Sequence, residues 1–564
     1  MDPFVGINIA WASSSSGAEE DEDADLAEED QSRGIFQMFW FCVWKCLRIP
    51  RQPPASATEA ERDKDGGSML QDQLVRVAVV ETPEELEVFE QLSLEESLRQ
   101  LDDEKSSDDI PNRSESAAAL TRHSSRNLSA ADSFADLDVD ARPVTDSPFF
   151  GVPALAPMAA TSTVLIQDSL SPRKEPKAEG RPAHHLNDTQ SLFTNPWPSF
   201  GTHFQAGAFG ALWAILSEWK RNPMPPKEEY VRVAAPTWAL DPAPETWAGD
   251  IKATWLGHAC FLVEFPAPFA SAPEAGADIG APARGPRVLF DPVFSQRCSP
   301  NQWIGPKRFT PPPMPLKDLP HVDLVVLSHD HYDHTDTNTL QHIYAAQPKG
   351  SVHFLCGLGN LAYFKSLGIA PAHVTELDWW DARDATISFP GAASTLTVTC
   401  TPAQHFSGRG LTNRMQTLWA SWAIEQRALP GAPAGAKVWF GGDTGVRAVP
   451  ANFTGDLGAQ PVCPAFAQIG ERFGGFDLAL VPIGAFSPRG ALSPVHASPA
   501  DAVLIHRAVR SRRSIGMHWG CWALSDEPFM QDPKRLAEAC AQGGVGAGEF
   551  VTVYVGETVR QTPV

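Results

Sequence analysis

One short stretch, "VVLSHDHYDHTD" (325–336), carries three histidines and two aspartates within six residues. They form the pattern His-x-His-x-Asp-His, made by His329, His331, Asp333 and His334. Alternate side chains of an extended segment point the same way, so His329 and His331 can hold one ion while the next pair turns toward a second point. Neutral imidazole and carboxylate groups suit borderline divalent metals, zinc above all. The stretch therefore predicts a metal cluster.

Three single polar residues elsewhere follow apolar, strand-like runs in the same way. His405 follows "TVTCTPAQ", Asp443 follows "KVWFGG" and His518 follows "RSIGM". An isolated histidine is more often an ordinary core or surface residue, so none of the three predicts a ligand by itself. Added to the first four residues, they give seven ligands. That number is enough for two ions about 3.5–4 Å apart with one bridging carboxylate.

Strand-like runs recur from about residue 250 onward, and several are apolar throughout, as in strands that are buried on both faces. The predicted strands cover residues 251–265, 287–293, 322–328, 351–356, 394–400, 417–425, 437–443, 476–484, 513–519 and 550–556. Helical patterns cover about 335–346, 360–367, 498–511 and 532–542. Strands that first pair as hairpins and then alternate with helices predict an α/β fold of two sheets between helices. The histidine cluster then lies on a loop at the carboxyl end of its strand.

The charge of the chain is concentrated at its beginning. Of the formal charge of −23, residues 1–150 hold −20, with 33 acidic and 13 basic residues. An acidic block such as 19–30 repels itself and forms no core, and residues 105–190 have the composition of a linker. We therefore predict a mostly disordered region over residues 1–190 and a folded domain over 191–564. An acidic chain without a basic stripe is a poor general nucleic-acid binder.

Three apolar segments could contact a membrane or a partner. Residues 34–51 concentrate Phe and Trp beside Lys and Arg, which suits a membrane interface or a segment folded back onto the domain. Residues 82–101 place leucines along one face of a short amphipathic helix. The stretch 195–219 offers either a second membrane surface or an ordinary core helix.

Cysteine usage and hydropathy indicate the setting of the protein. Nine cysteines are scattered without a CxxC pair, which predicts reduced thiols and an intracellular location. No run of 18 or more apolar residues exists, so no membrane-spanning helix is predicted. Three inserts rich in Ala, Pro and Gly are expected to be exposed loop tips, at 267–286, 428–436 and roughly 453–475.

Longer stretches narrow the metal cluster to one family. They are "FTNPWPS" (193–199), "TWLGHACFLVE" (254–264), "DPVFSQRCSP" (291–300), "GPKRFTPPP" (305–313), "LSHDHYDH" (327–334), "TPAQHFSGRG" (401–410), "LWASWAI" (418–424), "GGDTG" (441–445), "PIGAFSPR" (482–489) and "HWGCWAL" (518–524). In this order they resemble the N-acylphosphatidylethanolamine-hydrolysing phospholipase D family, which has the metallo-β-lactamase fold, over roughly residues 192–564. Two positions depart from that family, with Phe486 in place of a tyrosine and Val495 in place of a polar amide.

The resemblance implies an αββα metallo-β-lactamase sandwich that holds two zinc ions. One zinc ion is expected on His329, His331 and His405. The second is expected on Asp333, His334 and His518, with Asp443 bridging the two. His496 matches a site histidine that is not a ligand, and we expect it to contact the phosphate or to donate a proton. Asp333 is expected to take part in catalysis, and His258 to have a supporting place near the substrate.

The activity that the resemblance implies is zinc-dependent hydrolysis of N-acylphosphatidylethanolamine to phosphatidic acid and an N-acylethanolamine. Because this substrate lies in a bilayer, we expect an intracellular enzyme bound peripherally to a membrane surface, and the family implies a homodimer. Two alternatives stay open. One is another metal-dependent hydrolase of the same fold, such as a lactonase or a cyclic phosphodiesterase, with a small polar pocket. The other is a non-catalytic membrane- or partner-binding scaffold, which would have lost ligands.

Overall fold

The computed structural model describes residues 162–169, 181–201, 222, 225–238, 249–268, 284–410, 412–429, 435–528 and 530–564. Several predictions lie outside the described residues. They concern the acidic region 1–161, with its segments 34–51 and 82–101, and the part of the apolar stretch 195–219 that follows residue 201.

The folded elements form two sheets and their covering helices. The first sheet contains β2 (Ile251–Gly257), β3 (Cys260–Glu264), β4 (Arg287–Phe290), β5 (Leu324–Val326), β6 (His353–Gly357), β7 (Val374–Leu377) and β15 (Thr558–Gln561). The second contains β1 (Thr163–Asp168), β8 (Ala382–Phe389), β9 (Ala392–Thr401), β10 (Ser421–Gln426), β11 (Lys437–Phe440), β12 (Leu478–Pro482), β13 (Ser514–Met517) and β14 (Phe550–Val551). The helices are α5 (Thr337–Ala346), α6 (Leu361–Ser366), α7 (Ala465–Phe473), α8 (Arg489–Leu492), α9 (Pro499–Ala508) and α10 (Asp532–Gly543). Short 3-10 turns lie at Pro198–Phe200, Lys227–Glu229, Leu316–Asp318, Pro371–His373 and Leu457–Ala459.

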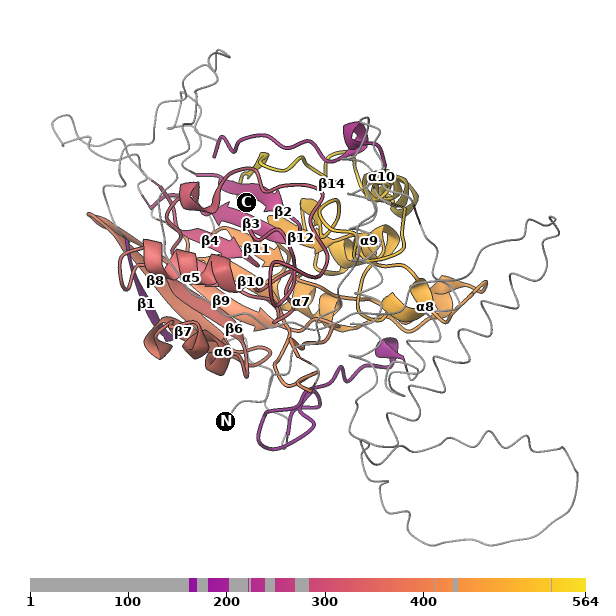
Figure 1. Cartoon of the computed structure of the whole chain (residues 1–564), viewed down its shortest axis with the longest axis horizontal. Coiled ribbons are helices and arrows are strands. Elements are labelled where there is room, and N and C mark those ends of the chain that lie inside the picture. The colour runs from indigo at the N-terminus through magenta and orange to yellow at the C-terminus, as the bar shows by residue number, and fades with distance from the viewer. Residues whose placement is uncertain are drawn as a thin grey trace, which may run out of the picture. The chain divides into compact units, whose positions relative to one another are not determined.

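The two sheets have the same plan, antiparallel hairpins followed by parallel strands (Figure 1). The first sheet runs in the order β15-β2-β3-β4-β5-β6-β7, and the strands from β4 to β7 are parallel. The second runs β1-β8-β9-β10-β11-β12-β13-β14, and the strands from β11 to β14 are parallel. The carboxyl ends of the parallel strands in each sheet therefore meet at one edge, where the metal cluster was predicted.

The central strands are apolar throughout because each buries both faces. In β5, Leu324 and Val326 join the large core that also contains Trp422 and Phe440 of the second sheet. Val325, between them, joins a second core with Leu340 of α5. Successive side chains of a strand point to opposite faces, so a strand between two cores needs no polar alternation.

Helices cover the outer face of each sheet, which completes the predicted αββα sandwich. On the second sheet, α9 contacts β12, and α10 contacts α9 and β14. The predicted start of α9 is confirmed, because Ser498 and Asp501 form a reciprocal capping box around Pro499. On the first sheet, α5 packs against β5. This helix begins after its N-cap Asp336, whose side chain accepts a hydrogen bond from the backbone N–H of Asn338.

The linker prediction for residues 105–190 is wrong at Thr163–Asp168. These six residues form β1, an edge strand that pairs antiparallel with β8. Val164 and Ile166 pack against the main core, whereas Leu165 between them is exposed. The alternation of half-buried and exposed side chains is that of an edge strand, and the Ser- and Pro-rich residues around it obscured the pattern.

The insert at 453–475 is also not the exposed loop tip that its composition predicts. Its second half forms α7, which buries Phe466, Ile469 and Phe473. These residues lie three and four apart and so share one helix face.

Most of insert 267–286 and the middle of insert 428–436 lie outside the described residues. Among the helices of the described ranges, none is long and apolar enough to cross a membrane.

Candidate metal centre

The loop after β5 and the loop after β9 supply the first group of imidazoles. His329 and His331 leave the end of β5, and their Nε2 and Nδ1 atoms lie 2.8 Å apart. His405, four residues past β9, brings its Nε2 to 3.3 Å from the same Nδ1 of His331. One nitrogen of each ring therefore points to a common centre, as was predicted for the first ion.

The second group joins the same β5 loop to the end of β13. Asp333 Oδ2 lies 3.4 Å from His334 Nε2 and 3.5 Å from His518 Nε2. The two imidazole nitrogens lie 3.2 Å from each other. The side chains of His334 and His518 are fully buried, and Asp333 is slightly exposed. The three residues predicted for the second ion are thus in contact.

Asp443, which follows β11, lies between the two groups. Its Oδ2 lies 3.1 Å from His334 Nε2, and 3.7 Å and 3.9 Å from Nε2 of His405 and His329. Its Oδ1 lies 3.0 Å from His518 Nε2. The structure therefore brings all seven predicted ligands together, with the predicted bridging carboxylate in the middle.

The donor set fits divalent cations better than it fits a hydrogen-bond network. One carboxylate, Asp443, has five imidazole nitrogens within 4 Å, and three of them lie too far away for a hydrogen bond. Buried charges of this kind are normally paired or bound to metal. Imidazole nitrogen and carboxylate oxygen are donors that zinc accepts. The chemistry and the geometry of the cluster therefore both fit a divalent metal site.

Neighbouring groups fix the orientation of the ligands. Asp291, directly after β4, accepts a 2.7 Å hydrogen bond from His334 Nδ1 and is itself held by the backbone N–H and the hydroxyl of Ser328. The Nδ1 of His405 donates to the carbonyl oxygen of Val495 at 2.9 Å. Bonds of this kind fix the tautomer, so Nε2 is left free to bind metal. Because Val495 contributes its backbone, the departure from a polar amide at this position leaves the contact intact.

The pKa shifts in the centre follow from burial and from the two carboxylates. Burial lowers the pKa of His405 to about 4, which keeps its imidazole neutral. Burial also opposes the charged form of His518, but Asp443 and Asp333 outweigh it and raise its pKa to about 9. Burial likewise disfavours an ionised Asp443, yet His334 and His518 hold its pKa well below the ordinary value. The carboxylates thus carry negative charge that a divalent cation can balance.

His496 and His258 occupy different places beside this centre. The Nδ1 of His496 is buried, lies 3.9 Å from Asp443 Oδ2 and makes no hydrogen bond among the described residues. His258, in the β2–β3 turn, places its Nε2 3.1 Å from Asp333 Oδ2 and its ring 4.0 Å from that of His518. His496 is therefore free to meet another molecule, whereas His258 is already engaged with a metal-site carboxylate.

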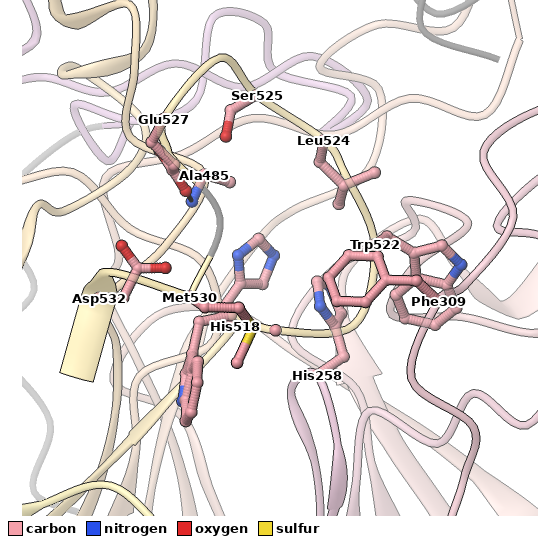
Figure 2. Close-up of a pocket in the computed structure, with 12 residues that line it drawn as sticks. His258, Phe309, Ala485, His518, Trp522, Leu524, Ser525, Glu527, Met530 and Asp532 are labelled. Carbon is pink, nitrogen blue, oxygen red and sulfur yellow. Dashed lines mark hydrogen bonds between the residues drawn. The ribbon is translucent and has the colours of Figure 1, made fainter. Parts of the chain in front are cut away.

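A hollow beside the centre has an aromatic wall and an acidic wall. Figure 2 shows His258 and His518 between Trp522 and Phe309 on one side and Glu527 and Asp532 on the other. Burial raises the pKa of Glu527, although the backbone N–H groups of residues 485–487 donate to its carboxylate. Burial and then Glu527 raise the pKa of Asp532 well above its ordinary value.

Three acidic residues of the centre were not predicted from the sequence. Asp291 follows the apolar run of β4 in the way that Asp443 follows β11, so the same pattern could have identified it. Glu527 lies in the loop beyond β13 and Asp532 is the first residue of α10, so neither follows an apolar strand as the predicted ligands do. A separate group, His184 and His185 on Asp378 at 2.8 and 3.0 Å, anchors the segment before β2 to the end of β7. Both histidines are buried, so the predicted disorder of residues 1–190 is wrong at this segment too.

Comparisons with known proteins agree with this description. A family model described as "Beta-lactamase superfamily domain" matches residues 286–519, which contain all seven predicted ligands. The chain is 32% identical over 373 residues to a Caenorhabditis elegans protein named "N-acyl-phosphatidylethanolamine-hydrolyzing phospholipase D 1". That alignment covers 65% of this chain and 91% of the relative.

Two further relatives match a shorter part of the chain. An uncharacterised protein of Mycobacterium tuberculosis is 36% identical over 319 residues, covering 56% of this chain and 69% of the relative. A Saccharomyces cerevisiae protein named "N-acyl-phosphatidylethanolamine-hydrolyzing phospholipase D, mitochondrial" is 30% identical over 292 residues, or 52% of each chain. The predicted fold class is therefore confirmed as that of the metallo-β-lactamases, and the protein is a metal-dependent hydrolase of that fold.

Proposed function

The chain belongs to the N-acylphosphatidylethanolamine-hydrolysing phospholipase D family, and from this membership we propose that it hydrolyses N-acylphosphatidylethanolamine at a centre with two zinc ions. Water adds to the phosphodiester, and the bond from phosphorus to the N-acylethanolamine oxygen breaks. The products are phosphatidic acid and an N-acylethanolamine. The observation that carries the proposal is that all seven predicted ligands lie in one cluster, with Asp443 between its two groups, in a chain of this family.

The residues of the chain divide into two ligand groups for this task. His329, His331 and His405 would hold one ion, and Asp333, His334 and His518 the other, with Asp443 shared between them. When bound, such ions supply water activated at neutral pH and positive charge for the phosphate oxygens. Asp291 and the carbonyl of Val495 keep His334 and His405 in the tautomer that leaves Nε2 available.

His496 is the residue that we assign to the substrate. Its Nδ1 is buried, near Asp443 and without a hydrogen bond among the described residues, so it can donate to a phosphate oxygen or protonate the departing N-acylethanolamine oxygen. Asp333 contributes to catalysis as the carboxylate of the second ligand group. His258 acts through Asp333, because its Nε2 lies 3.1 Å from that carboxylate. We therefore assign His258 a positioning role in place of direct substrate binding.

The substrate places the protein at a membrane. A phospholipid with three acyl chains stays in its bilayer, so we propose a peripheral membrane enzyme inside the cell that acts at the bilayer surface. A homodimer, as expected for this family, is part of the same proposal.

The proposal is tested with the purified chain and vesicles that contain N-acylphosphatidylethanolamine. Released N-acylethanolamine and bound metal are measured for the natural chain and for Asp443→Asn. We expect two zinc ions per chain, and we expect Asp443→Asn to lose metal and at least about 100-fold in activity, because one carboxylate serves both ligand groups. The matched control is Asp477→Asn, a buried carboxylate that accepts hydrogen bonds from Lys437 and Arg512 away from the centre.

Three results would contradict the proposal in different ways. Two bound metals without lipid cleavage would move the function to another hydrolase of the same fold, such as a lactonase or a cyclic phosphodiesterase. A chain without metal would make the scaffold interpretation the leading one. Activity that survives in Asp443→Asn would exclude this cluster as the reaction centre.

A further inference from the structure

One loop of the described chain exposes a tryptophan side chain to solvent. Trp303 is 89% exposed and Ile304 beside it is 52% exposed, and no other large hydrophobic side chain of the described residues is as exposed as Trp303. Both lie at the tip of a hairpin between β4 and the 3-10 turn at Leu316–Asp318, which we call the Trp303 hairpin (residues 296–309). A single exposed apolar residue is ordinary, but an adjacent Trp and Ile at the tip of a loop together offer an apolar surface that suits contact with a partner.

Hydrogen bonds within the Trp303 hairpin fix its backbone, so the exposed position of its tip is part of the folded structure. The backbone N–H groups of Trp303 and Ile304 both donate to Asn301 Oδ1, at 2.9 and 3.0 Å. The side chain of Gln302 exchanges two 3.0 Å hydrogen bonds with the backbone of Arg297. Because polar groups inside the turn satisfy one another, the two apolar side chains are left to point outward.

Glycine completes this turn. Gly305 has a φ of +103°, a conformation that L side chains rarely adopt, and a Cβ there would lie 2.7 Å from the Cβ of Ser299. Arg297 and Lys307 form an antiparallel bridge just below, and Arg297 Nη1 donates to the carbonyl of Gly305. The hairpin is therefore a defined structure that closes tightly behind its tip.

The base of the Trp303 hairpin is bonded to the wall of the candidate metal centre. The indole N–H of Trp522 donates to the carbonyl of Gln296, and the backbone N–H of Phe309 donates to the carbonyl of Cys521. Phe309 and Trp522 both line the hollow that also contains His258 and His518 (Figure 2). The exposed Trp and Ile thus belong to a hairpin whose base is bonded to the wall of this hollow.

We propose that the Trp303 hairpin is an anchor that inserts into the interfacial layer of a lipid bilayer and sets the centre against the membrane. The proposal rests on the proposed lipid substrate, since a bilayer is the partner that a phospholipid hydrolase must meet at its rim. Tryptophan favours the boundary between headgroups and acyl chains, because its ring is apolar and its N–H is polar. Lys307 is exposed near the tip and adds a positive charge that suits anionic headgroups.

The test measures binding of the full chain to vesicles that contain no substrate, so catalysis is not required for the result. Vesicles of phosphatidylcholine with phosphatidylglycerol are sedimented with the natural chain or with the double variant Trp303→Ser, Ile304→Ser. We expect the double variant to partition at least about tenfold less, because it removes the interfacial tryptophan and its apolar neighbour. Circular dichroism and metal content verify that the variant is folded.

The matched control removes two exposed apolar side chains elsewhere. Leu165 in β1 is 55% exposed and Leu504 in α9 is 37% exposed, and neither belongs to the centre or to the hairpin. The double variant Leu165→Ser, Leu504→Ser is expected to bind vesicles like the natural chain. Equal losses in both double variants, or no loss in either, would overturn the proposal.

Two further outcomes separate this proposal from the proposed activity. A dimer in solution that dissociates in Trp303→Ser, Ile304→Ser without vesicles would assign the hairpin to contact with a second copy and overturn the bilayer anchor. If vesicle binding depends on Trp303 and Ile304 but N-acylphosphatidylethanolamine is not cleaved, the anchor stands and the proposed substrate fails.

Discussion

At the scale of single residues, Asp291 holds the candidate centre in place from behind. Its Oδ2 accepts a 2.7 Å hydrogen bond from Nδ1 of His334, whose Nε2 is the nitrogen that lies near Asp443. The N–H and hydroxyl of Ser328 donate to its two oxygens. Both carboxylate oxygens of Asp291 thus accept hydrogen bonds. In an asparagine, the side-chain NH₂ would replace one of these oxygens and would face a hydrogen-bond donor. The orientation of His334 consequently depends on a carboxylate at this position.

We therefore predict that Asp291→Asn lowers zinc affinity about 10- to 100-fold, the usual effect of removing a group that orients a metal-bound histidine. Competition with a chelator of known affinity measures this change. Asp477→Asn, which removes another buried carboxylate, is the control and is expected to keep normal zinc affinity while losing stability. Unchanged zinc affinity in Asp291→Asn would show that the orientation of His334 is fixed by packing alone.

The sequence predicted the convergent residues of the centre because they share one local pattern. His405, Asp443 and His518 each follow an apolar strand, and the structure places each of them at the edge where parallel strands end. Asp291 follows the same pattern but was included in a predicted strand at 287–293. Glu527 and Asp532 could not be predicted from this pattern, because Glu527 lies in a loop, Asp532 begins α10, and neither directly follows an apolar strand.

At the scale of elements, the local composition around β1 and α7 gives wrong predictions, because packing against the core decides the structure of both. The Ser, Asp and Pro residues around β1 predict a linker, although Val164 and Ile166 reach the core from an edge position. The stretch around α7 is rich in Gly, Ala and Pro, and this composition predicts an exposed insert. Its large buried residues Phe466, Ile469 and Phe473 have helical spacing, and this periodicity outweighs composition. Each predicted apolar run contains a strand, because burial on both faces leaves an unbroken signal, although the run 251–265 forms two strands, β2 and β3. The less apolar strands β7, β8 and β15 were not predicted.

Gly470 lies where α7 packs against α9, so a substitution there tests whether the fold requires the close approach of these two helices. A Cβ at this position would lie 2.0 Å from the carbonyl oxygen of Ala508, at the end of α9. Alanine usually stabilises a helix relative to glycine by about 1 kcal/mol. Here the clash with the backbone of α9 forces the two helices apart, and overpacking of this kind costs about 1–3 kcal/mol. We therefore predict that Gly470→Ala is net destabilising despite its higher helix propensity.

Urea unfolding of the zinc-loaded chain measures this difference. The control is Gly249→Ala, because a Cβ at Gly249 would meet no atom within 4 Å, and its expected change lies within about 0.5 kcal/mol. A gain in stability for Gly470→Ala would mean that α7 and α9 can separate at little cost. The close approach of the two helices would then not be required by the fold.

At the scale of the whole described fold, the candidate centre joins the two sheets. His329, His331, Asp333 and His334 follow β5 of the first sheet, whereas His405, Asp443 and His518 follow strands of the second. Each proposed ion takes ligands from both sheets. Bound metal should therefore stabilise the sandwich as a unit, since a group that binds only the folded state adds to its stability by mass action.

We predict that removal of metal by a chelator lowers the midpoint of thermal unfolding by about 5 °C or more, because tight binding contributes roughly 4 kcal/mol when free zinc is 1,000-fold above its dissociation constant. Adding zinc back should restore the midpoint. Asp443→Asn is expected to unfold near the metal-free midpoint and to respond little to the chelator, because the carboxylate that both ligand groups share is lost. If metal analysis shows the ions removed while the natural chain keeps its midpoint, the two sheets are held together by their apolar core alone. The centre would then add chemistry to a sandwich that is already stable without it.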